Sequence, residues 1–158
     1  MIDRLADAWE AAWSGRDGGA FGAVCAPDVH YEDPLTPVPL QGPDAIGLHA
    51  GRAWAGFPDL IMRRAGERLG AGRFVALPVV LVGTNTAELE TLPPSRASIS
   101  LHVVFYCELD PEERLLWRVR AFFDTYAAGV ELGILPRRGS LRERALMVIQ
   151  GYGLRLGR

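Results

Sequence analysis

The sequence predicts an α+β fold in which helices come first and an antiparallel sheet follows. Apolar residues recur at helical spacing in the first third of the chain, and they alternate with polar residues through much of the second half. Short segments rich in glycine or proline separate the alternating runs. Helical periodicity followed by a meander of strands is typical of α+β domains.

The length and composition indicate one globular domain. The chain has 158 residues, of which 49% are hydrophobic and 23% charged. These are ordinary values for a single soluble domain. A formal net charge of −2 gives no electrostatic footprint for nucleic acid. All 17 basic residues are arginine, so mechanisms that need a lysine, such as a Schiff base or a P-loop, are excluded.

The first part of the chain reads as mainly helical. Trp9 and Trp13 lie on one stripe of a first amphipathic helix, which ends at Gly15. A short strand further along the chain ends at Pro34. The predicted elements are a helix over residues 2–13, a short helix within 17–27, a strand over 29–33, a proline-rich loop to residue 43 and a helix over 44–55.

The second part reads as strands followed by one helix. Turns at residues 70–72 and 110–113 separate the alternating segments, and a loop covers residues 83–95. Ser140 and Glu143 form a capping box for a C-terminal helix that extends to Tyr152. The predicted strands are residues 60–68, 73–82, 99–109 and 115–126.

The last hairpin has two different faces. One face is apolar on both strands, for example at Leu101, Val103 and Val119, so we expect it to be buried in the core or across a dimer. The other face carries a polar and aromatic set, namely His102, Tyr106, Arg120, Phe122 and Asp124. This second face is either a solvated sheet surface or the polar lining of a pocket.

Other residue types argue against further classes of site. Cys25 and Cys107 have apolar neighbours, so buried free thiols are expected rather than a disulfide. The three histidines are too widely spaced to form a short ligand pair, and no dinucleotide-binding fingerprint is present, so we expect neither metal nor cofactor. No signal-like or membrane-spanning segment is apparent, which predicts a cytoplasmic protein.

Several short motifs resemble one known family in their order and spacing. They are Tyr31-Glu32-Asp33-Pro34, Phe57-Pro58-Asp59-Leu60, Gly83-Thr84-Asn85-Thr86, Arg120-Ala121-Phe122-Phe123-Asp124 and Leu132-Gly133-Ile134-Leu135-Pro136. Together they resemble the SnoaL-like polyketide cyclases over residues 5–136. The chain has Ala87 where relatives often carry glycine, so that loop is expected to differ in shape.

The resemblance implies a fold and a domain plan. SnoaL-like proteins belong to the nuclear-transport-factor-2-like (cystatin-like) superfamily, in which a curved antiparallel sheet wraps around helices as a cone with a deep pocket. The implied plan is one domain over residues 1–158, with a core at 5–136 and a C-terminal helical extension at 137–158. A homodimer is the implied assembly.

The resemblance also implies an activity: cofactor-independent cyclisation or isomerisation of a hydrophobic, polyketide-like secondary metabolite by acid–base catalysis, as in an aldol ring closure. Asp124 matches the acid/base aspartate of the family, and Asp33 matches the proton-shuttling base of related steroid isomerases. Arg120 and His102 are the expected helpers, the first for an enolate oxygen and the second for a carbonyl or a proton relay.

The substrate is expected to contact mainly aromatic side chains. The candidate binding residues are Trp13, Tyr31, His49, Trp54, Phe57, Tyr106 and Phe122.

Three alternatives remain open from the sequence. Asp33, Arg120 and Asp124 match the Asp-Arg-Asp set of epoxide-opening relatives, provided that both carboxylates reach one water. A second alternative is an enzyme that promotes a pericyclic ring closure by shape. The third is a non-catalytic ligand-binding or dimerisation module, which an entirely apolar pocket with Asp124 in bulk water would favour.

Overall fold

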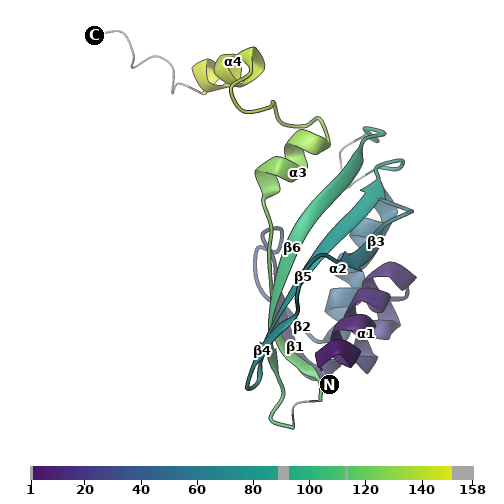
Figure 1. Cartoon of the computed structure of the whole chain (residues 1–158). Helices are drawn as coiled ribbons and strands as arrows, with labels where there is room; N and C mark the ends of the chain where they lie inside the picture. Colours follow the sequence, from purple (N-terminus) through teal and green to yellow (C-terminus); the bar gives the residue numbers. More distant parts are fainter. Residues whose placement is uncertain (1, 89–92, 113, 151–158) are drawn as a thin grey trace.

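The computed structural model describes residues 2–88, 93–112 and 114–150, and it shows a curved sheet with helices against one face (Figure 1). The elements are α1 (Ile2–Gly15), the 3-10 helix η1 (Gly18–Ala23), β1 (Cys25–Glu32), β2 (Leu40–Gln41), α2 (Pro43–Gly56), β3 (Ile61–Arg64), β4 (Leu69–Ala71), β5 (Phe74–Thr84), β6 (Ser98–Leu109), β7 (Leu116–Phe122), α3 (Thr125–Glu131) and α4 (Leu141–Ile149). The predicted α+β class is confirmed.

The strands form one sheet in the order β2-β1-β7-β6-β5-β3, with β4 also paired to β5. The pairs are antiparallel except β1 with β7, which run parallel. The expectation of a purely antiparallel sheet is therefore wrong at this pair. The chain reaches β7 only after it has passed through α2 and the β5–β6 hairpin, so β7 comes back beside β1 in the same direction.

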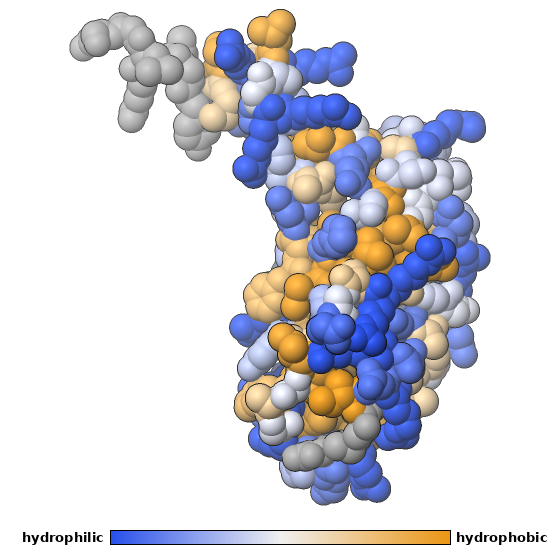
Figure 2. Space-filling view, viewed as in Figure 1, coloured by the Kyte–Doolittle hydropathy of each residue, from blue (hydrophilic) through white to orange (hydrophobic). Residues whose placement is uncertain are grey.

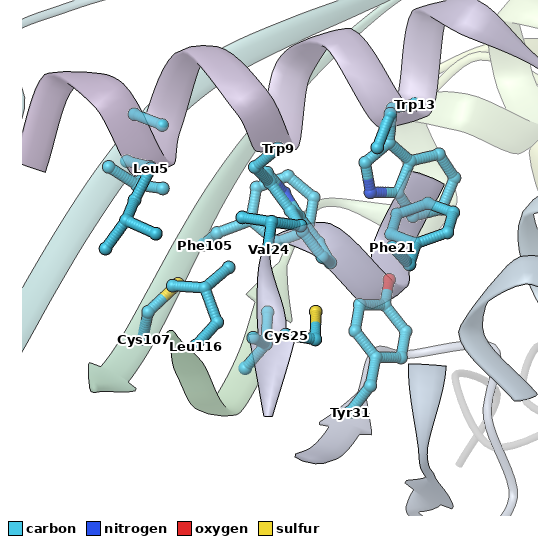
Figure 3. Close-up of a cluster of buried hydrophobic side chains, with 14 of the residues drawn as sticks. Leu5, Trp9, Trp13, Phe21, Val24, Cys25, Tyr31, Phe105, Cys107 and Leu116 are labelled. Carbon is cyan, nitrogen blue, oxygen red and sulfur yellow. The ribbon is translucent and has the colours of Figure 1, made fainter. Parts of the chain in front are cut away.

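The core lies between α1 and the inner face of the sheet (Figure 3). Trp9 packs edge-on against Phe21 and Phe105, with ring centroids 5.3 Å apart in both pairs. Val103 and Val119 from the last hairpin are 2% and 1% exposed. The prediction that the apolar face of this hairpin is buried is thus confirmed, and burying these side chains is the main stabilising term of the fold.

Helix α2 packs closely against η1 because a glycine of each helix lies at the contact. A Cβ built on Gly47 would lie 2.7 Å from the carbonyl oxygen of Gly18 and 2.9 Å from its Cα. Such distances are not tolerated between backbone and side chain, so only glycine at position 47 lets α2 approach η1 this closely. The contact therefore fixes how closely α2 packs against η1.

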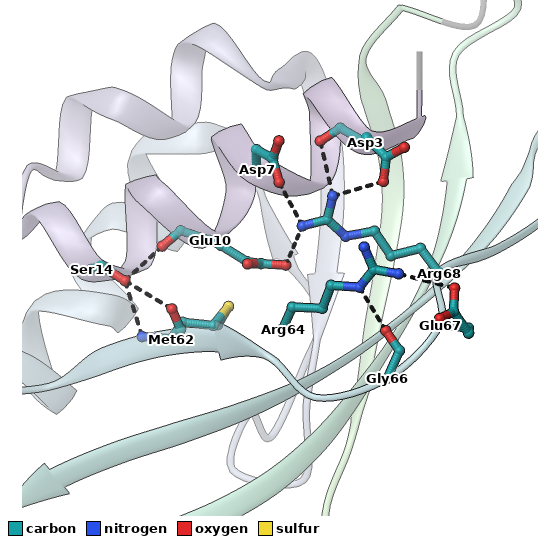
Figure 4. A network of polar contacts seen from close by, with 9 residues as sticks. All are labelled: Asp3, Asp7, Glu10, Ser14, Met62, Arg64, Gly66, Glu67 and Arg68. Carbon is teal, nitrogen blue, oxygen red and sulfur yellow. Dashed lines mark hydrogen bonds and ion pairs between the residues drawn. The ribbon is translucent and has the colours of Figure 1, made fainter.

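Helix α1 is fastened to the sheet by Arg68, which precedes β4 (Figure 4). Its guanidinium donates to carboxylates of Asp3, Asp7 and Glu10 at 2.9, 2.6 and 2.8 Å. The Arg68 side chain is only 6% exposed, so the acidic side of α1 compensates a largely buried charge.

Some predicted boundaries differ from the observed ones. The expected strand over residues 60–68 is split into β3 and β4. Strand β1 begins earlier than expected and includes Pro27, because the pairing with β7 is irregular between Cys25 and His30 and needs no N–H donor there. Strand β7 ends at Phe122, earlier than expected, because Asp124 caps α3, a helix that the sequence pattern did not predict.

The predicted cap of the C-terminal helix is present. The Ser140 hydroxyl accepts the N–H of Glu143 at 3.1 Å at the start of α4. This helix stands apart from the sheet in Figure 1, none of its residues is buried, and apolar side chains remain on its surface in Figure 2. Tyr152, expected at the end of the helix, lies outside the described residues.

Two further findings concern the cysteines and the membrane. Cys25 and Cys107 are buried free thiols, as predicted. Burial raises the pKa of Cys25 to about 12, so it stays protonated near neutral pH. Among the described residues, no helix is long and apolar enough to cross a bilayer.

The glycine contact gives a matched pair of substitutions on α2. Gly47→Ala should lower the free energy of unfolding by about 1–3 kcal/mol, because the new methyl group forces α2 away from η1. Gly51→Ala meets nothing within 4 Å and should raise it by about 0.5–1 kcal/mol through helix propensity. Urea unfolding of both variants checks the pair; equal effects would show that the close approach is not required.

Candidate active site

An apolar cavity of about 420 Å³ lies between the inner face of the sheet and the helices α1, α2 and α3. Its size is within the range of small-ligand pockets. Most of the wall is aliphatic or aromatic, and the polar lining groups are few. The main lining side chains are Trp13, Tyr31, Asp33, Leu35, His49, Arg52, Phe57, Leu81, Ile99, Leu101, Phe105, Phe123, Thr125, Leu132 and Ile134.

The polar end of this cavity centres on the carboxylate of Asp33. Its Oδ2 accepts the Tyr31 hydroxyl at 2.8 Å and lies 2.7 Å from Nε2 of His49. Its Oδ1 accepts the backbone N–H groups of Leu35 and Thr36 at 2.7 and 3.0 Å. Four partners saturate a carboxylate, which offers about four lone-pair sites in total.

These contacts keep Asp33 ionised although its side chain is only 4% exposed. Burial alone would raise the pKa of Asp33, but hydrogen bonds from His49, Tyr31 and the Leu35 N–H outweigh it, and the pKa lies below its ordinary value. The same surroundings raise the pKa of Tyr31 well above its ordinary value, chiefly through burial and then through the Asp33 charge. Tyr31 therefore stays a neutral donor.

An ionised Asp33 fixes the proton of His49. A carboxylate only accepts hydrogen bonds, so the neutral imidazole must carry its proton on Nε2 and keep its lone pair on Nδ1. Among the described residues, Nδ1 has no hydrogen-bond partner. The His49 side chain is 16% exposed and lines the cavity, so the imidazole ring borders the space that a ligand would occupy.

The local sequence explains how these groups meet. Tyr31 and Asp33 are two residues apart on an extended chain, so both point to the inner face. The turn after β1 then closes on Asp33, whose own N–H donates to the Thr36 hydroxyl at 3.0 Å. His49 falls on the buried stripe of α2 with Ile46 and Ala50, and this stripe faces β1.

Part of the predicted site is assembled here. Asp33, His49, Tyr31, Trp13 and Phe57 all line the cavity. Trp54 lies beside it, and its Nε1 donates to the carbonyl oxygen of Trp13 at 2.8 Å.

The remaining predicted residues lie elsewhere, which corrects the expected pocket. His102, Tyr106, Arg120 and Phe122 are exposed on the outer face of the sheet, because they alternate with the inward-pointing Phe105, Ala121 and Phe123. The hairpin face with the polar set is the solvated one, and the apolar face borders the cavity. Arg120 forms an ion pair with Glu32 there.

Asp124 is also outside the cavity lining. It is exposed, and its side chain accepts the N–H of Ala127 at 3.0 Å as the N-cap of α3. Its neighbours Phe123 and Thr125 line the cavity instead.

The pairing of Asp33 with His49 and the presence of Arg52 were not anticipated. The signal available in the sequence was the helical stripe: His49 follows Ile46 by three residues and precedes Ala53 by four, which places it on the inward side. The contribution of α3 was not predicted, because the expected strand over residues 115–126 was extended into the first two residues of this helix. Among the described residues, no group of three potential metal ligands occurs.

The lowered pKa of Asp33 gives a test of the site by stability. A carboxyl group with a depressed folded pKa stabilises the protein above its unfolded pKa of about 3.9, and this contribution is lost as the pH falls through the folded value. Asp33→Asn should therefore lower the free energy of unfolding by about 2 kcal/mol at neutral pH. The difference from wild type should shrink below about pH 4.

Denaturant unfolding from pH 7 to pH 3 measures this difference. Asp44→Asn is the control, because Asp44 is exposed at the start of α2. A difference between wild type and Asp33→Asn that stays constant with pH would show that the charge of Asp33 is not stabilised by its partners.

Comparison with known proteins shows that several solved structures share this fold. Among solved structures, TsrD from Streptomyces laurentii matches with a TM-score of 0.73 at 16% identity, over 85% of this chain and 96% of that one. A protein of Catenulispora acidiphila with a ketosteroid isomerase-like fold, in complex with trimethylamine, matches with a TM-score of 0.72 at 16% identity, over the same shares. AclR from Streptomyces galilaeus matches with a TM-score of 0.72 at 19% identity, over 95% and 92%.

These identities are low, so the structural matches show the shared fold alone. A search of curated proteins finds no significant match. The family model of the SnoaL-like polyketide cyclases, however, matches residues 3–113, well over half of the chain. The chain therefore belongs to the SnoaL-like polyketide cyclase family.

Proposed function

We propose that this protein is a cofactor-independent cyclase or isomerase whose acid/base group is His49, held by Asp33. The observation that carries the proposal is the 2.7 Å contact between His49 Nε2 and Asp33 Oδ2 at the polar end of an apolar cavity. A histidine oriented by a buried carboxylate is a common arrangement for proton transfer at neutral pH. The apolar walls suit a hydrophobic small molecule, such as a polyketide-like secondary metabolite.

The chemistry needs only a proton shuttle. His49 Nδ1 removes a proton from a carbon next to a substrate carbonyl, and Asp33 stabilises the imidazolium that forms. The resulting enolate carbon attacks a second carbonyl carbon, which closes a ring by one new C–C bond. The imidazolium then returns the proton to the new alkoxide, so no oxidant or cofactor is consumed. Return of the proton to a different carbon gives an isomerisation instead.

Asp33 is less suited to be the base itself. Its four partners occupy both oxygens, and its pKa is held below the ordinary value, so it binds a proton weakly. This differs from the role implied by the resemblance to steroid isomerases, in which the equivalent of Asp33 takes the proton, and from the expectation that His49 only contacts the substrate. Asp33 is then a positioning residue, and His49 is the catalytic one.

The alternative functions have less support. For epoxide opening, Asp33 faces the cavity, whereas Arg120 pairs with Glu32 on the outer face and Asp124 caps α3, so the three groups do not meet. For a non-catalytic module, the exposed position of Asp124 fits, but the buried Asp33–His49 pair does not. A pericyclic enzyme would use the same cavity without depending on His49.

Deuterium exchange on a simple hydrophobic ketone tests the proposal. With 2-tetralone in D2O, NMR should show exchange of the protons next to the carbonyl, and His49→Gln should slow it about 100-fold or more. Asp33→Asn should also slow it, because the imidazole loses the partner that fixes its proton on Nε2.

The matched controls are His102→Gln and Asp124→Asn, which alter the same residue types outside the cavity. Both should retain wild-type exchange. If Asp124→Asn abolishes exchange while His49→Gln preserves it, the role implied by the family motif is right and ours is wrong.

The outer face of the sheet suits a second copy of the chain. Large apolar side chains are exposed on β5, β6 and β7, namely Phe74, Val104, Tyr106 and Phe122, and the rings of the first and third stack 5.9 Å apart. Charges of both signs surround them, at Glu32, Glu108, Arg118 and Arg120. A patch with both signs of charge complements itself across a two-fold axis, whereas it has no preference for a strongly charged partner.

Light scattering at micromolar concentration tests this assembly. Wild type should be a dimer, and Phe122→Glu should give a folded monomer, because burying the new carboxylate is unfavourable. Leu48→Glu, at a residue 76% exposed on α2, should leave the dimer intact. A monomeric wild type rules the interface out.

A further inference from the structure

The cavity contains a positive charge that the proposed proton transfer does not use. Arg52 lines the cavity from α2, three residues after His49, so the two side chains lie on the same side of the helix one turn apart. Arg52 is exposed, which places it where the cavity meets solvent. It is the one cation among the described lining residues, apart from a protonated His49.

Arg52 shares with several exposed arginines, such as Arg63, the lack of a carboxylate partner among the described residues, but it alone of these lines the cavity. Arg64, Arg68, Arg73 and Arg120 each form an ion pair within 3.0 Å of a carboxylate. Within the described ranges, Arg52 forms neither an ion pair nor a side-chain hydrogen bond. Asp33, the acidic group of the same cavity, is already saturated by His49, Tyr31 and two backbone N–H groups.

A guanidinium on the rim of an apolar cavity selects for a particular kind of ligand. It remains charged at every working pH and presents parallel N–H donors that match a carboxylate or another oxyanion. The walls below it are aliphatic and aromatic, including Leu101, Phe57 and Leu81. A ligand that satisfies both parts has an apolar body and one anionic end.

We propose that Arg52 binds an anionic group of the substrate, so that the substrate class is a hydrophobic carbonyl compound with a carboxylate or similar oxyanion at one end. This inference rests on the proposed function, because it concerns the same cavity. The anion held by Arg52 sets how deep the apolar body enters. That depth brings the reacting carbon to His49, one helical turn away.

Two fluorescent probes that differ only in charge test this inference. 1-Anilinonaphthalene-8-sulfonate carries a sulfonate, and N-phenyl-1-naphthylamine is the same ring system without it. Wild type should bind the sulfonate more tightly than the neutral amine, and added NaCl should reduce the preference. Arg52→Gln should weaken sulfonate binding about five- to tenfold and change amine binding less than about twofold.

Two kinds of control tie the result to this residue and this cavity. Arg63→Gln removes an exposed arginine of β3 that is not a lining residue, and it should change neither affinity. Leu101→Trp fills part of the cavity and should weaken both probes; Ala128→Phe, from α3, does the same if the first variant folds poorly. Circular dichroism checks the fold of each variant.

The outcomes are decisive for Arg52. A loss confined to the sulfonate in Arg52→Gln supports the inference. Equal losses for both probes, no loss, the same loss in Arg63→Gln, or binding that neither cavity-filling variant reduces would each overturn it. Deuterium exchange reports the proposed proton transfer and probe binding reports the role of Arg52, so failure of the proposed function and failure of this inference are observed separately.

Discussion

The site depends on one buried carboxylate and the four groups that bind it. Asp33 lies at the end of β1 and would be costly to bury as an anion, yet a tyrosine hydroxyl, an imidazole and two backbone N–H groups surround it. Each of these donors favours the ionised form, and together they outweigh desolvation. As long as Asp33 stays charged, a neutral His49 carries its proton on Nε2, which leaves Nδ1 as the proposed base.

The rest of the fold holds Asp33 and His49 within hydrogen-bond distance of each other. Asp33 directly follows β1 and His49 lies in α2, so their contact requires that α2 keep a fixed distance from the end of β1. The close approach of Gly47 to Gly18 holds α2 against η1, and Trp9 and Trp13 pack in the core on the inner face of the sheet. Arg68 fastens α1, which carries both tryptophans, to the sheet. The packing of the core therefore keeps His49 and Asp33 within hydrogen-bond distance of each other.

The periodicity of apolar residues predicts much of the fold, but it predicts only part of the candidate site. Helical and strand patterns predict α1, α2, the long hairpin and the cap of α4, because each depends on neighbouring residues. Tyr31, Asp33 and His49 were each candidates, yet their meeting joins a strand end to a helix 16 residues later, which no local pattern encodes. Asp124 was misplaced because strand alternation was extended through a residue that caps a helix. The polar face of the hairpin was ambiguous, since alternation separates two faces without stating which one meets a cavity.

The central claim is that the neutral form of the His49 ring carries its proton on Nε2, held by an ionised Asp33, so that Nδ1 can act as the proposed base. Nitrogen-15 NMR of the histidine rings measures this directly, and the chain has only three histidines to assign. Comparison with His49→Gln identifies the signals. In the neutral ring of the wild-type protein, we expect a protonated Nε2 and an unprotonated Nδ1, with this preference lost in Asp33→Asn. A proton on Nδ1 in the wild-type protein, or the same tautomer in Asp33→Asn, would contradict it.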